Sequence, residues 1–280
     1  MEQAIPSKTA LSVALRRAAH QIHDSPVVFD DPIAVALLGT TYAEELRRTP
    51  VRTDRPFSIA LRAFLVARSR YAEDTLRKAV EGGVEQYVLL GAGLDTFAYR
   101  NSYAQLRVFE VDHPATQQWK RELLQRNRIA IPDSVTYAPV DFERHSLSTQ
   151  LGDAGFNHRA PAFFAWLGVV PYLTLEAFRG TLNFISAQPP GTGLTLDYGQ
   201  PRAVLPLLER LAHDSLASRV EKAGEPFQLF FTPAGIAAEF SRFHSLEDLG
   251  APEINARYFS GRTDQLGVRG AAGHLFSAWL

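Results

Sequence analysis

The sequence contains no cysteine, and its 280 residues include a single methionine. The absence of cysteine excludes a disulfide framework, a thiolate zinc site, an iron–sulfur cluster and a cysteine nucleophile. An excess of positive charge is missing as well, since 29 Lys and Arg residues stand against 30 Asp and Glu residues. This balance argues against binding nucleic acid through its phosphates. The chemistry of this chain therefore has to come from other side chains or from an organic cofactor.

Long apolar segments are also missing. The longest apolar stretch, 160–170, is too short and too mixed for a transmembrane helix. The N-terminus lacks a basic segment followed by an apolar run, which is the pattern of a signal peptide. We therefore expect a soluble, cytoplasmic protein without a membrane partner. The length is compatible with one large domain or two small ones, and 46% hydrophobic residues is ordinary for a globular protein.

Residues 1–83 have a helical pattern. Asp31 and the proline after it precede a predicted short helix, 33–38, which is expected to end at Gly39. A long helix is predicted over 57–80, because its apolar residues recur at helical spacing and two glycines follow it. We interpret these 83 residues as a helical N-terminal extension or lid.

After residue 83, short apolar runs alternate with helical patterns. Such alternation indicates an α/β fold with a mostly parallel sheet and helices on both faces. No linker interrupts the chain, so we predict a single domain, 1–280, in which 84–280 forms the sheet core. The predicted strands are 86–90, 106–111, 135–140, 160–166 and 193–196, and the predicted helices between them are 116–129 and 174–187.

A glycine turn follows the first predicted strand, with Gly91, Ala92 and Gly93 directly after Leu90. Such a turn lets the backbone approach a ligand at the carboxyl end of a central strand, where open α/β sheets bind nucleotides. A dinucleotide fingerprint requires a third glycine where Thr96 stands, and no P-loop lysine follows. NAD and a phosphate-binding loop are therefore disfavoured, and a plain tight turn is the alternative.

Acidic residues stand at successive strand ends. Asp112 lies about twenty residues after the glycines, where a carboxylate can accept both hydroxyls of a ribose. Glu110 points to the same face of that strand. Asp141, followed by Phe142, is placed to bind an adenine amino group and to flank the ring, or else to cap a helix. Acidic residues at successive strand ends would rarely occur by chance, so together they favour an adenosyl ligand.

One cation interrupts an apolar stripe on the helix predicted over 57–80. Arg68 lies within this stripe, and a guanidinium that faces the core needs an anion. The anion is either an internal carboxylate in a buried salt bridge or the carboxylate of a ligand. The apolar members of the stripe are Phe57, Leu61, Phe64 and Tyr71. The remaining charges are expected to form a solvated face: Arg70, Glu73, Asp74, Arg77 and Lys78.

Short segments along nearly the whole chain carry a family resemblance: 7–10, 28–32, 67–71, 90–96, 109–112, 140–142, 172–173 and 268–270. With them the chain resembles the S-adenosylmethionine-dependent methyltransferases of the leucine carboxyl methyltransferase family. The similarity is strongest to the bacterial branch of small-molecule and polyketide O-methyltransferases. It implies a Rossmann-like class I methyltransferase fold, with a mostly parallel seven-stranded sheet, helices on both faces and an N-terminal helical lid.

The resemblance also implies S-adenosylmethionine as cofactor and assigns residues to it. Arg68 and Lys8 would hold the methionine carboxylate, Asp112 the ribose, and Asp141 with Phe142 the adenine. The glycine turn would pass under the methionine part. The full implied set is Lys8, Arg68, Gly91, Ala92, Gly93, Asp95, Asp112, Asp141 and Phe142.

One departure from the family pattern concerns an acid before the glycine of the strand-end motif. Leu167 stands where the family usually has a glutamate, which puts cofactor orientation or methyl transfer itself in question. The predicted function is O-methylation of a carboxylate or hydroxyl of a small metabolite, such as a polyketide-type natural product. The alternative is a methyltransferase-fold protein, cyclase-like or a binder, that holds the cofactor or a pathway intermediate without transferring a methyl group.

The acceptor and the catalytic groups stay open. A carboxylate acceptor needs no base, whereas a phenol or alcohol profits from one, and no histidine lies in a motif that marks it as that base. Tyr172 is a candidate for lining the acceptor pocket, with a core position as the alternative. No metal site is expected, and the sequence leaves a homo-oligomer open. The alternatives for five phenylalanines are the lining of an aromatic-acceptor pocket and a core position, and we expect the core position: Phe163, Phe164, Phe227, Phe230 and Phe231.

Overall fold

The computed structural model describes residues 7–48, 56–140, 146–222 and 224–280. The strands are β1 (Gln86–Leu90), β2 (Arg107–Asp112), β3 (Val135–Pro139), β4 (Phe163–Trp166), β5 (Gly193–Gly199), β6 (His244–Leu249) and β7 (Gly273–Trp279). The α-helices are α1 (Lys8–His23), α2 (Ala34–Arg48), α4 (Pro56–Glu81), α5 (Pro114–Arg126), α6 (Leu147–Asp153), α7 (Leu175–Ser186), α8 (Leu207–Lys222), α9 (Pro233–Glu239) and α10 (Ala251–Tyr258). Short 3-10 helices follow β1, β4 and β5: η1 (Phe97–Tyr99), η2 (Val170–Tyr172) and η3 (Arg202–Val204).

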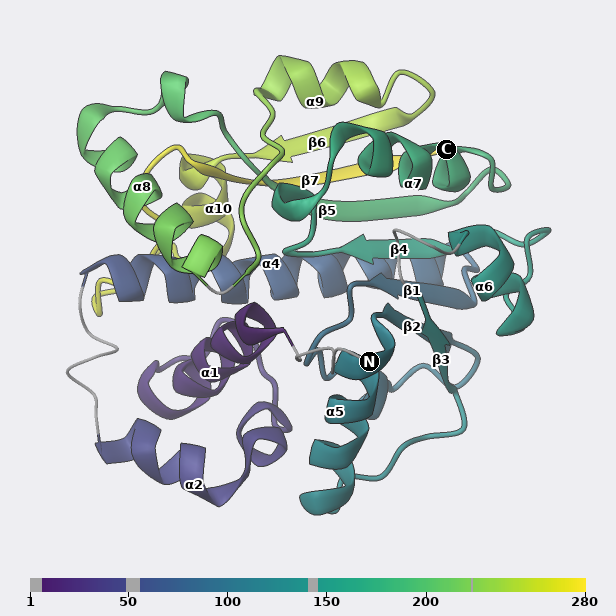
Figure 1. The fold of residues 1–280 in the computed structure, drawn as a ribbon, viewed down its shortest axis with the longest axis horizontal. Helices are drawn as coiled ribbons and strands as arrows, with labels where there is room; N and C mark the ends of the chain where they lie inside the picture. The colour runs from purple at the N-terminus through teal and green to yellow at the C-terminus, as the bar shows by residue number, and fades with distance from the viewer. Residues whose placement is uncertain (1–6, 49–55, 141–145, 223) are drawn as a thin grey trace.

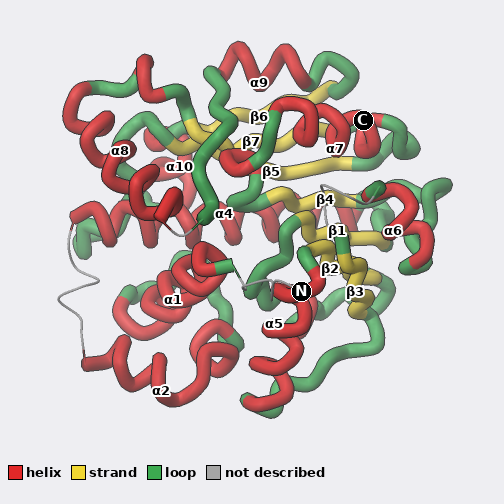
Figure 2. The backbone as a smooth tube through the Cα atoms, viewed as in Figure 1, coloured by secondary structure: helices red, strands yellow, loops and turns green. Residues whose placement is uncertain are grey.

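Within the described ranges, the strands form one seven-stranded sheet in the order β3-β2-β1-β4-β5-β7-β6 (Figure 1). Neighbours among β1 to β5 are parallel, whereas β7 runs antiparallel to both β5 and β6. Figure 2 shows helices on both sides of this sheet. The predicted mostly parallel seven-stranded α/β fold is confirmed.

The central strand β1 is buried on both faces. Val88 and Leu90 join the apolar cluster formed with α6, α7 and α9, whereas Tyr87 and Leu89 join the cluster formed with α1, α2, α4 and α5. Successive residues of a strand point to opposite faces, so a strand covered on both sides is apolar at consecutive positions. This explains why the uninterrupted apolar run before Gly91 predicts β1 correctly.

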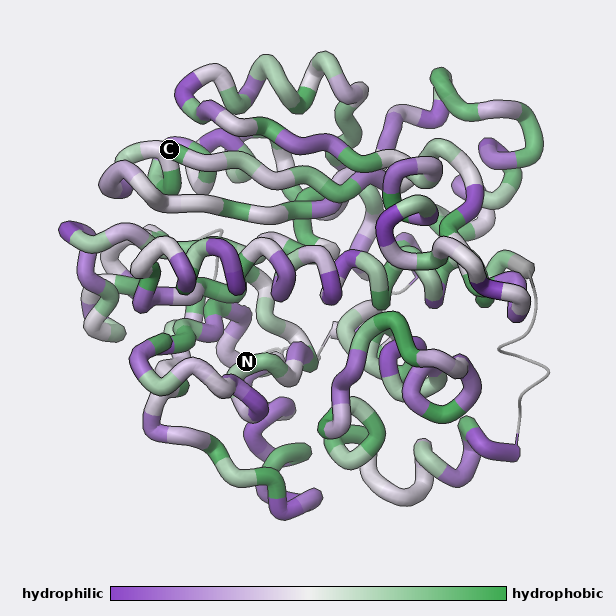
Figure 3. The backbone as a smooth tube through the Cα atoms, turned by 180° about the vertical axis from the view of Figure 1, so that it is seen from behind, coloured by the Kyte–Doolittle hydropathy of each residue, from purple (hydrophilic) through white to green (hydrophobic). Residues whose placement is uncertain are grey.

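Helix α4 crosses behind the sheet and connects it to the N-terminal helices (Figure 1). Its residue Val66 packs in one apolar cluster with Ile254 of α10 and Leu275 of β7. Seen from behind, hydrophilic and hydrophobic residues alternate along α4 (Figure 3). We predicted that the charged side of α4 faces only solvent. One of its residues, Glu73, instead accepts hydrogen bonds from Arg100 in the loop after β1.

The predicted helix 33–38 is interrupted at Gly39 as expected, but a second helical stretch, which was not predicted, follows directly. The structure has a longer helix, α2, with a kink at Gly39, whose φ of 81° is non-helical. Asp31 caps its beginning, since Oδ1 accepts a hydrogen bond from the backbone N–H of Ala34. Helical structure resumes after the kink because Ala43 on the second part is buried. Gly39 thus separates two helical stretches, because its positive φ is accessible to glycine and incompatible with a continuous helix.

The N-terminal helices pack against the rest of the chain. Helix α1 contacts α2 and α4, and α2 contacts α5. The division of a single domain into a lid, 1–83, and a sheet core, 84–280, stays a prediction. In the residues that the structure describes, no helix has the length and apolar character needed to cross a bilayer. No three Asp, Glu or His side chains in those residues come together as metal ligands.

Candidate functional site

A cavity of about 1220 Å³ lies where the parallel strands β1, β2, β4 and β5 end. The order of strands reverses between β1 and β4, and such a reversal opens a crevice at the carboxyl ends of the strands. The wall also includes parts of α1, α4 and α8. Pockets for one ligand usually measure about 300–1000 Å³. This cavity therefore has room for two molecules side by side.

The glycine turn forms part of the cavity wall. The backbone N–H groups of Gly91 and Ala92 both donate to the carbonyl oxygen of Val111, at 2.8 and 3.0 Å. Gly91 has a φ of 69° and Gly93 a φ of 48°, in the left-handed region that favours glycine. A Cβ at Gly91 would lie 2.4 Å from Cγ2 of Val169. The turn thus needs glycine for both its conformation and its space.

Asp112 is fixed beside this turn. Its Oδ2 accepts from the backbone N–H of Gly93 at 2.6 Å, and its Oδ1 accepts from that of His113 at 2.7 Å. Burial raises the pKa of Asp112, although these two hydrogen bonds counteract the rise. Each carboxylate oxygen can accept a further hydrogen bond. Asp112 also lines the cavity, so it lies where the sequence predicts a ribose-binding acid.

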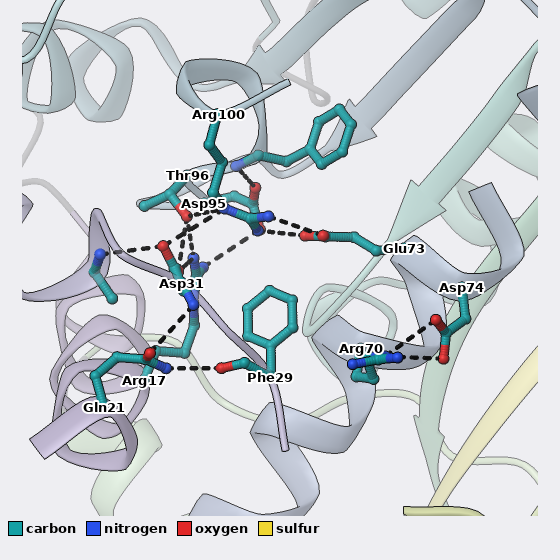
Figure 4. A network of polar contacts seen from close by, with 12 residues as sticks. Arg17, Gln21, Phe29, Asp31, Arg70, Glu73, Asp74, Asp95, Thr96 and Arg100 are labelled. Atoms are coloured by element: carbon teal, nitrogen blue, oxygen red, sulfur yellow. Dashed lines mark hydrogen bonds and ion pairs between the residues drawn. The ribbon is translucent and has the colours of Figure 1, made fainter. Parts of the chain in front are cut away.

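Asp95 lines the cavity too, but its carboxylate has partners inside the chain. Oδ1 accepts from the backbone N–H of Phe97 at 2.8 Å, and Oδ2 accepts from Nη1 of Arg17 at 3.3 Å. Arg17 also donates to Asp31 and to Thr96 (Figure 4). These contacts attach α1 to the loop after β1. We call this group the Arg17 network: Arg17, Asp31, Glu73, Asp95, Thr96 and Arg100.

Arg68 is buried and reaches the cavity from α4. Its Nη1 donates to Oδ2 of Asp197 at 3.0 Å, and Oδ1 of Asp197 accepts from the backbone N–H of Gly168. The internal salt bridge is therefore present. Among the described residues, Nε of Arg68 has no hydrogen-bond partner, as is also the case for Nε of Arg16 and Arg17. Arg68 is thus paired with Asp197 through Nη1 alone, and its guanidinium still has N–H groups for a ligand carboxylate at the cavity wall.

Asp197 was not predicted as a site residue. It lies in β5 between Leu196 and Tyr198, lines the cavity and is buried. An acid inside an otherwise apolar strand was the signal that could have identified it, by the same reasoning that identified Asp112.

The other predicted residues fall into three groups. Lys8 is exposed at the start of α1 and is not part of the cavity wall, whereas its neighbours Ser7 and Thr9 are. Asp141 and Phe142 lie outside the described residues. Tyr172 lines the cavity, and burial raises its pKa to about 12, so its phenol stays protonated at neutral pH. The ligands predicted for all these residues stay predictions.

Some aromatic residues lie elsewhere than expected. Phe163, Phe164 and Phe231 are buried in the core as predicted, but Phe227 and Phe230 line the cavity. His213 of α8 also lines it and was missed entirely. The segment around Phe227 has no regular secondary structure, so its sequence offers no periodicity from which its position could be inferred.

Together, the strand order and the position of the cavity define a fold of the class I methyltransferase type. The residues present fit an adenosyl amino acid, because a glycine turn, a strand-end carboxylate and a buried guanidinium with an unpaired donor surround one cavity. The fold of two solved structures supports this class. The chain superimposes on a Streptomyces avermitilis duf574 family protein with a TM-score of 0.58 and 19% identity, covering 87% of this chain and 94% of the other. A Thermobifida fusca protein described as a "putative methyltransferase" gives a TM-score of 0.59 and 18% identity, with 95% and 93% covered.

A model of the leucine carboxyl methyltransferase family matches residues 10–186. The Bacillus subtilis protein named "Putative S-adenosyl-L-methionine-dependent methyltransferase YktD" is 33% identical over 285 residues, which cover 93% of each chain. A Mycobacteroides abscessus protein with the same description is 34% identical, covering 73% of this chain and 67% of its own. The chain belongs to the leucine carboxyl methyltransferase family. The leucine carboxyl methyltransferase family, the predicted fold and S-adenosylmethionine as cofactor are thus confirmed, whereas the narrower branch within the family stays a prediction.

Proposed function

We propose that this protein is an S-adenosylmethionine-dependent O-methyltransferase that acts on a carboxylate or hydroxyl of a small metabolite. The observation that carries the proposal is a single cavity of about 1220 Å³ in which the glycine turn, Asp112 and Arg68 share a wall with a set of aromatic side chains. The cofactor supplies a methyl group that its positive sulfur already activates. The protein therefore has mainly to align two ligands and to exclude water.

Each residue of the cofactor part has a defined task in this proposal. Arg68 binds the methionine carboxylate through guanidinium N–H groups other than the one that Nη1 donates to Asp197, and Asp197 holds the guanidinium in place. Asp112 accepts the ribose hydroxyls with the lone pairs that Gly93 and His113 leave free. Tyr172 belongs to the wall of the acceptor part.

The acceptor is a small molecule in this proposal, such as a natural product of the polyketide type. The balanced charge of the chain, 29 cationic against 30 acidic residues, offers no general attraction for nucleic acid. We place the reaction in the cytoplasm.

The alternative function, a cofactor-binding protein without methyl transfer, depends on Leu167. Leu167 lines the cavity and packs against an apolar cluster, so no acid projects from this position. The acid Asp197 nevertheless lies directly beside it, hydrogen-bonded to the backbone N–H of Gly168. Asp197 lies in β5 and contacts the residue after Leu167, so a carboxylate is present near this position even though the usual glutamate is absent, which favours the enzyme.

Calorimetric titration with S-adenosylmethionine tests the cofactor part. The wild type should bind, and Asp112→Ala should lower the affinity about tenfold or more, because hydrogen bonds to a charged group are lost. Asp153→Ala, which removes an exposed acid outside the cavity, is the control and should bind like the wild type. A wild type that does not bind would contradict both the enzyme and the alternative.

A transfer screen separates the two functions. Cofactor with a labelled methyl group is incubated with a panel of carboxylic acids and a panel of phenols, and label in the product is counted. Transfer to any member supports the enzyme. Tight cofactor binding without transfer to either panel would support the alternative.

A further inference from the structure

One part of the cavity wall is aromatic. Its members come from three segments of the chain, namely η2, α8 and the loop before α9. The ring of Phe227 lies 5.3 Å from that of Tyr172 and 6.0 Å from that of Phe230, between centroids. The imidazole of His213 lies 5.3 Å from the ring of Phe230. We call this group the aromatic wall: Tyr172, His213, Phe227 and Phe230.

The loop that carries Phe227 and Phe230 is held in place by its backbone. The N–H of Gln228 donates to the carbonyl oxygen of Pro171 at 2.7 Å, and that of Phe231 donates to Gly199 at 3.0 Å. A Cβ at Gly199 would lie 3.2 Å from Cδ1 of Phe230, so this ring packs directly on the end of β5. The aromatic wall is therefore preformed, and a ligand does not need to order it.

The imidazole of His213 lacks a hydrogen bond at either nitrogen. In the part of the chain that the structure describes, both ring nitrogens are buried and neither has a hydrogen-bond partner. The carboxylate of Asp214 lies 3.7 Å from Nδ1, beyond hydrogen-bond distance, and is bonded to Arg202 instead. A neutral imidazole has one N–H and one lone pair, and burying both without a partner is unfavourable. Because the ring lines a ligand cavity, the missing partner is expected on the ligand.

We propose that the aromatic wall binds an acceptor whose aromatic ring bears a hydroxyl group, and that His213 accepts the proton of this hydroxyl. The inference rests on the proposed function and narrows its acceptor to a phenol-type compound. Aromatic side chains favour flat rings through stacked and edge-to-face contacts. In the proton transfer, the O–H bond breaks, an N–H bond forms on the imidazole, and the electron pair stays on the oxygen, which becomes the nucleophile. A carboxylate acceptor is already ionised at neutral pH and would have no proton for His213 to accept.

Glu225 is the competing base. Its Oε2 is likewise buried without a partner among the described residues, and its side chain lines the same cavity. It lies close enough to Tyr172 that its charge contributes to the raised pKa of that phenol, after burial. A test of His213 therefore has to include Glu225.

The test uses 2-naphthol, a fluorescent aromatic alcohol that becomes a strong acid when excited. Free in water it emits partly as naphtholate, because water accepts the proton. In a site that excludes water it emits as naphtholate only if a protein base accepts the proton, and otherwise as neutral naphthol. Binding to the full-length protein is followed by emission, with excitation beyond the tryptophan absorption. We expect naphtholate emission from the wild-type complex, and a ratio of naphtholate to naphthol emission about tenfold lower for His213→Phe. His213→Gln, which keeps a polar group without the base, should resemble His213→Phe.

Two controls define the outcome. His158→Phe changes an exposed histidine outside the cavity and should leave the emission ratio unchanged. With 2-methoxynaphthalene, which has no hydroxyl proton, wild type and His213→Phe should bind equally, whereas 2-naphthol should bind the wild type about fivefold more tightly than His213→Phe. Three results would overturn the proposal: no binding of 2-naphthol to the wild type, an unchanged ratio in both His213 variants, or loss of naphtholate emission in Glu225→Gln instead.

Calorimetry with S-adenosylmethionine on the same samples separates this inference from the proposed function. Cofactor binding without naphthol binding would overturn the phenol-type acceptor and leave the methyltransferase standing. The opposite result is that 2-naphthol binds with His213-dependent emission while S-adenosylmethionine does not bind. That result would contradict the methyltransferase function and would still support a site for an aromatic hydroxyl compound.

Discussion

Arg17 and Arg68 are both buried, but their surroundings differ. Arg17 contacts two carboxylates, those of Asp31 and Asp95, and its neighbour Arg100 binds Glu73 in the same network (Figure 4). Arg68 contacts a single carboxylate through a single nitrogen, on the wall of a cavity. Arg17 also lines the cavity, and its Nε, like that of Arg68, has no hydrogen-bond partner among the described residues. The two arginines therefore differ in how many carboxylates they contact. We expect Arg17, which contacts two, to contribute mainly to stability, and Arg68, which contacts one, to contribute mainly to ligand binding.

The largest expected effect comes from breaking the Arg17 network. Arg17→Met leaves the fully buried Asp31 without its main partner, and loss of one member of a buried pair costs about 3–5 kcal/mol. Urea unfolding should show a decrease of this size in the free energy of unfolding. Arg179→Met breaks an exposed pair with Glu239 and should have no measurable effect. A loss in Arg17→Met no greater than that in Arg179→Met would contradict the proposed role of the network.

Arg68 should behave in the opposite way. Arg68→Lys keeps the charge beside Asp197 but removes the planar group that can serve two carboxylates at once. We expect the affinity for S-adenosylmethionine to fall about tenfold, or about 1.4 kcal/mol, with a smaller change in unfolding free energy. Both quantities are measured on the same preparation. If stability falls and affinity does not, Arg68 is a structural residue only.

The pH dependence of stability should differ in sign between the two regions. Burial alone would raise the pKa of Asp31, but Arg17 and Arg100 hold it below its ordinary value. Folding therefore favours the charged form, and the stability that Asp31 contributes is present above the unfolded pKa, about 3.9, and lost as the pH falls through the lower folded pKa. Burial raises the pKa of Asp112, so folding disfavours its charged form. Acidification through this pKa protonates Asp112 and therefore increases its contribution to the free energy of unfolding.

Unfolding curves between about pH 6 and pH 3 test these signs. The stability of the wild type relative to Asp31→Asn should fall on acidification, whereas that relative to Asp112→Asn should rise. Equal trends for the two variants would show that the two carboxylates do not differ as the structure indicates.

The smallest expected effect concerns the departure from the family pattern. Leu167→Glu places an acid at the cavity wall, close to the existing carboxylate of Asp197. We expect an intact fold and a change of about two- to threefold in cofactor affinity, because partly exposed charges interact weakly. Calorimetry measures the change. An unchanged affinity would show that the departure has no consequence for cofactor binding.

The parts of the fold that depend on local sequence could be predicted. The run Tyr87–Leu90 is apolar at every position because both faces of β1 are covered. β6 lacks this signal, since its residues His244–Leu249 are mostly exposed or partly exposed. The place of β6 at the edge of the sheet depends on pairing with β7, which no local pattern specifies.

The same distinction applies to the site. Gly93 and Asp112 are 19 residues apart in the chain, and a strand-end rule relates them. Arg68 and Asp197 are 129 residues apart, so the sequence could indicate that Arg68 needs an anion without indicating which one. His213 depends on the packing of α8 against a loop without periodicity, and its place in the cavity could not have been inferred.

Gly168 has a φ of 69°, and a Cβ built on it would lie 2.7 Å from Nη1 of Arg68. The guanidinium thus occupies the volume that any larger residue at 168 would require. A substitution at 168 would have to adopt a positive φ and also displace the Arg68 side chain, so we expect glycine at 168 in relatives that keep arginine at 68. Under the proposed role of Arg68, a relative without this arginine would bind the methionine carboxylate less tightly, which makes this pair of positions a marker for a change of ligand within the family.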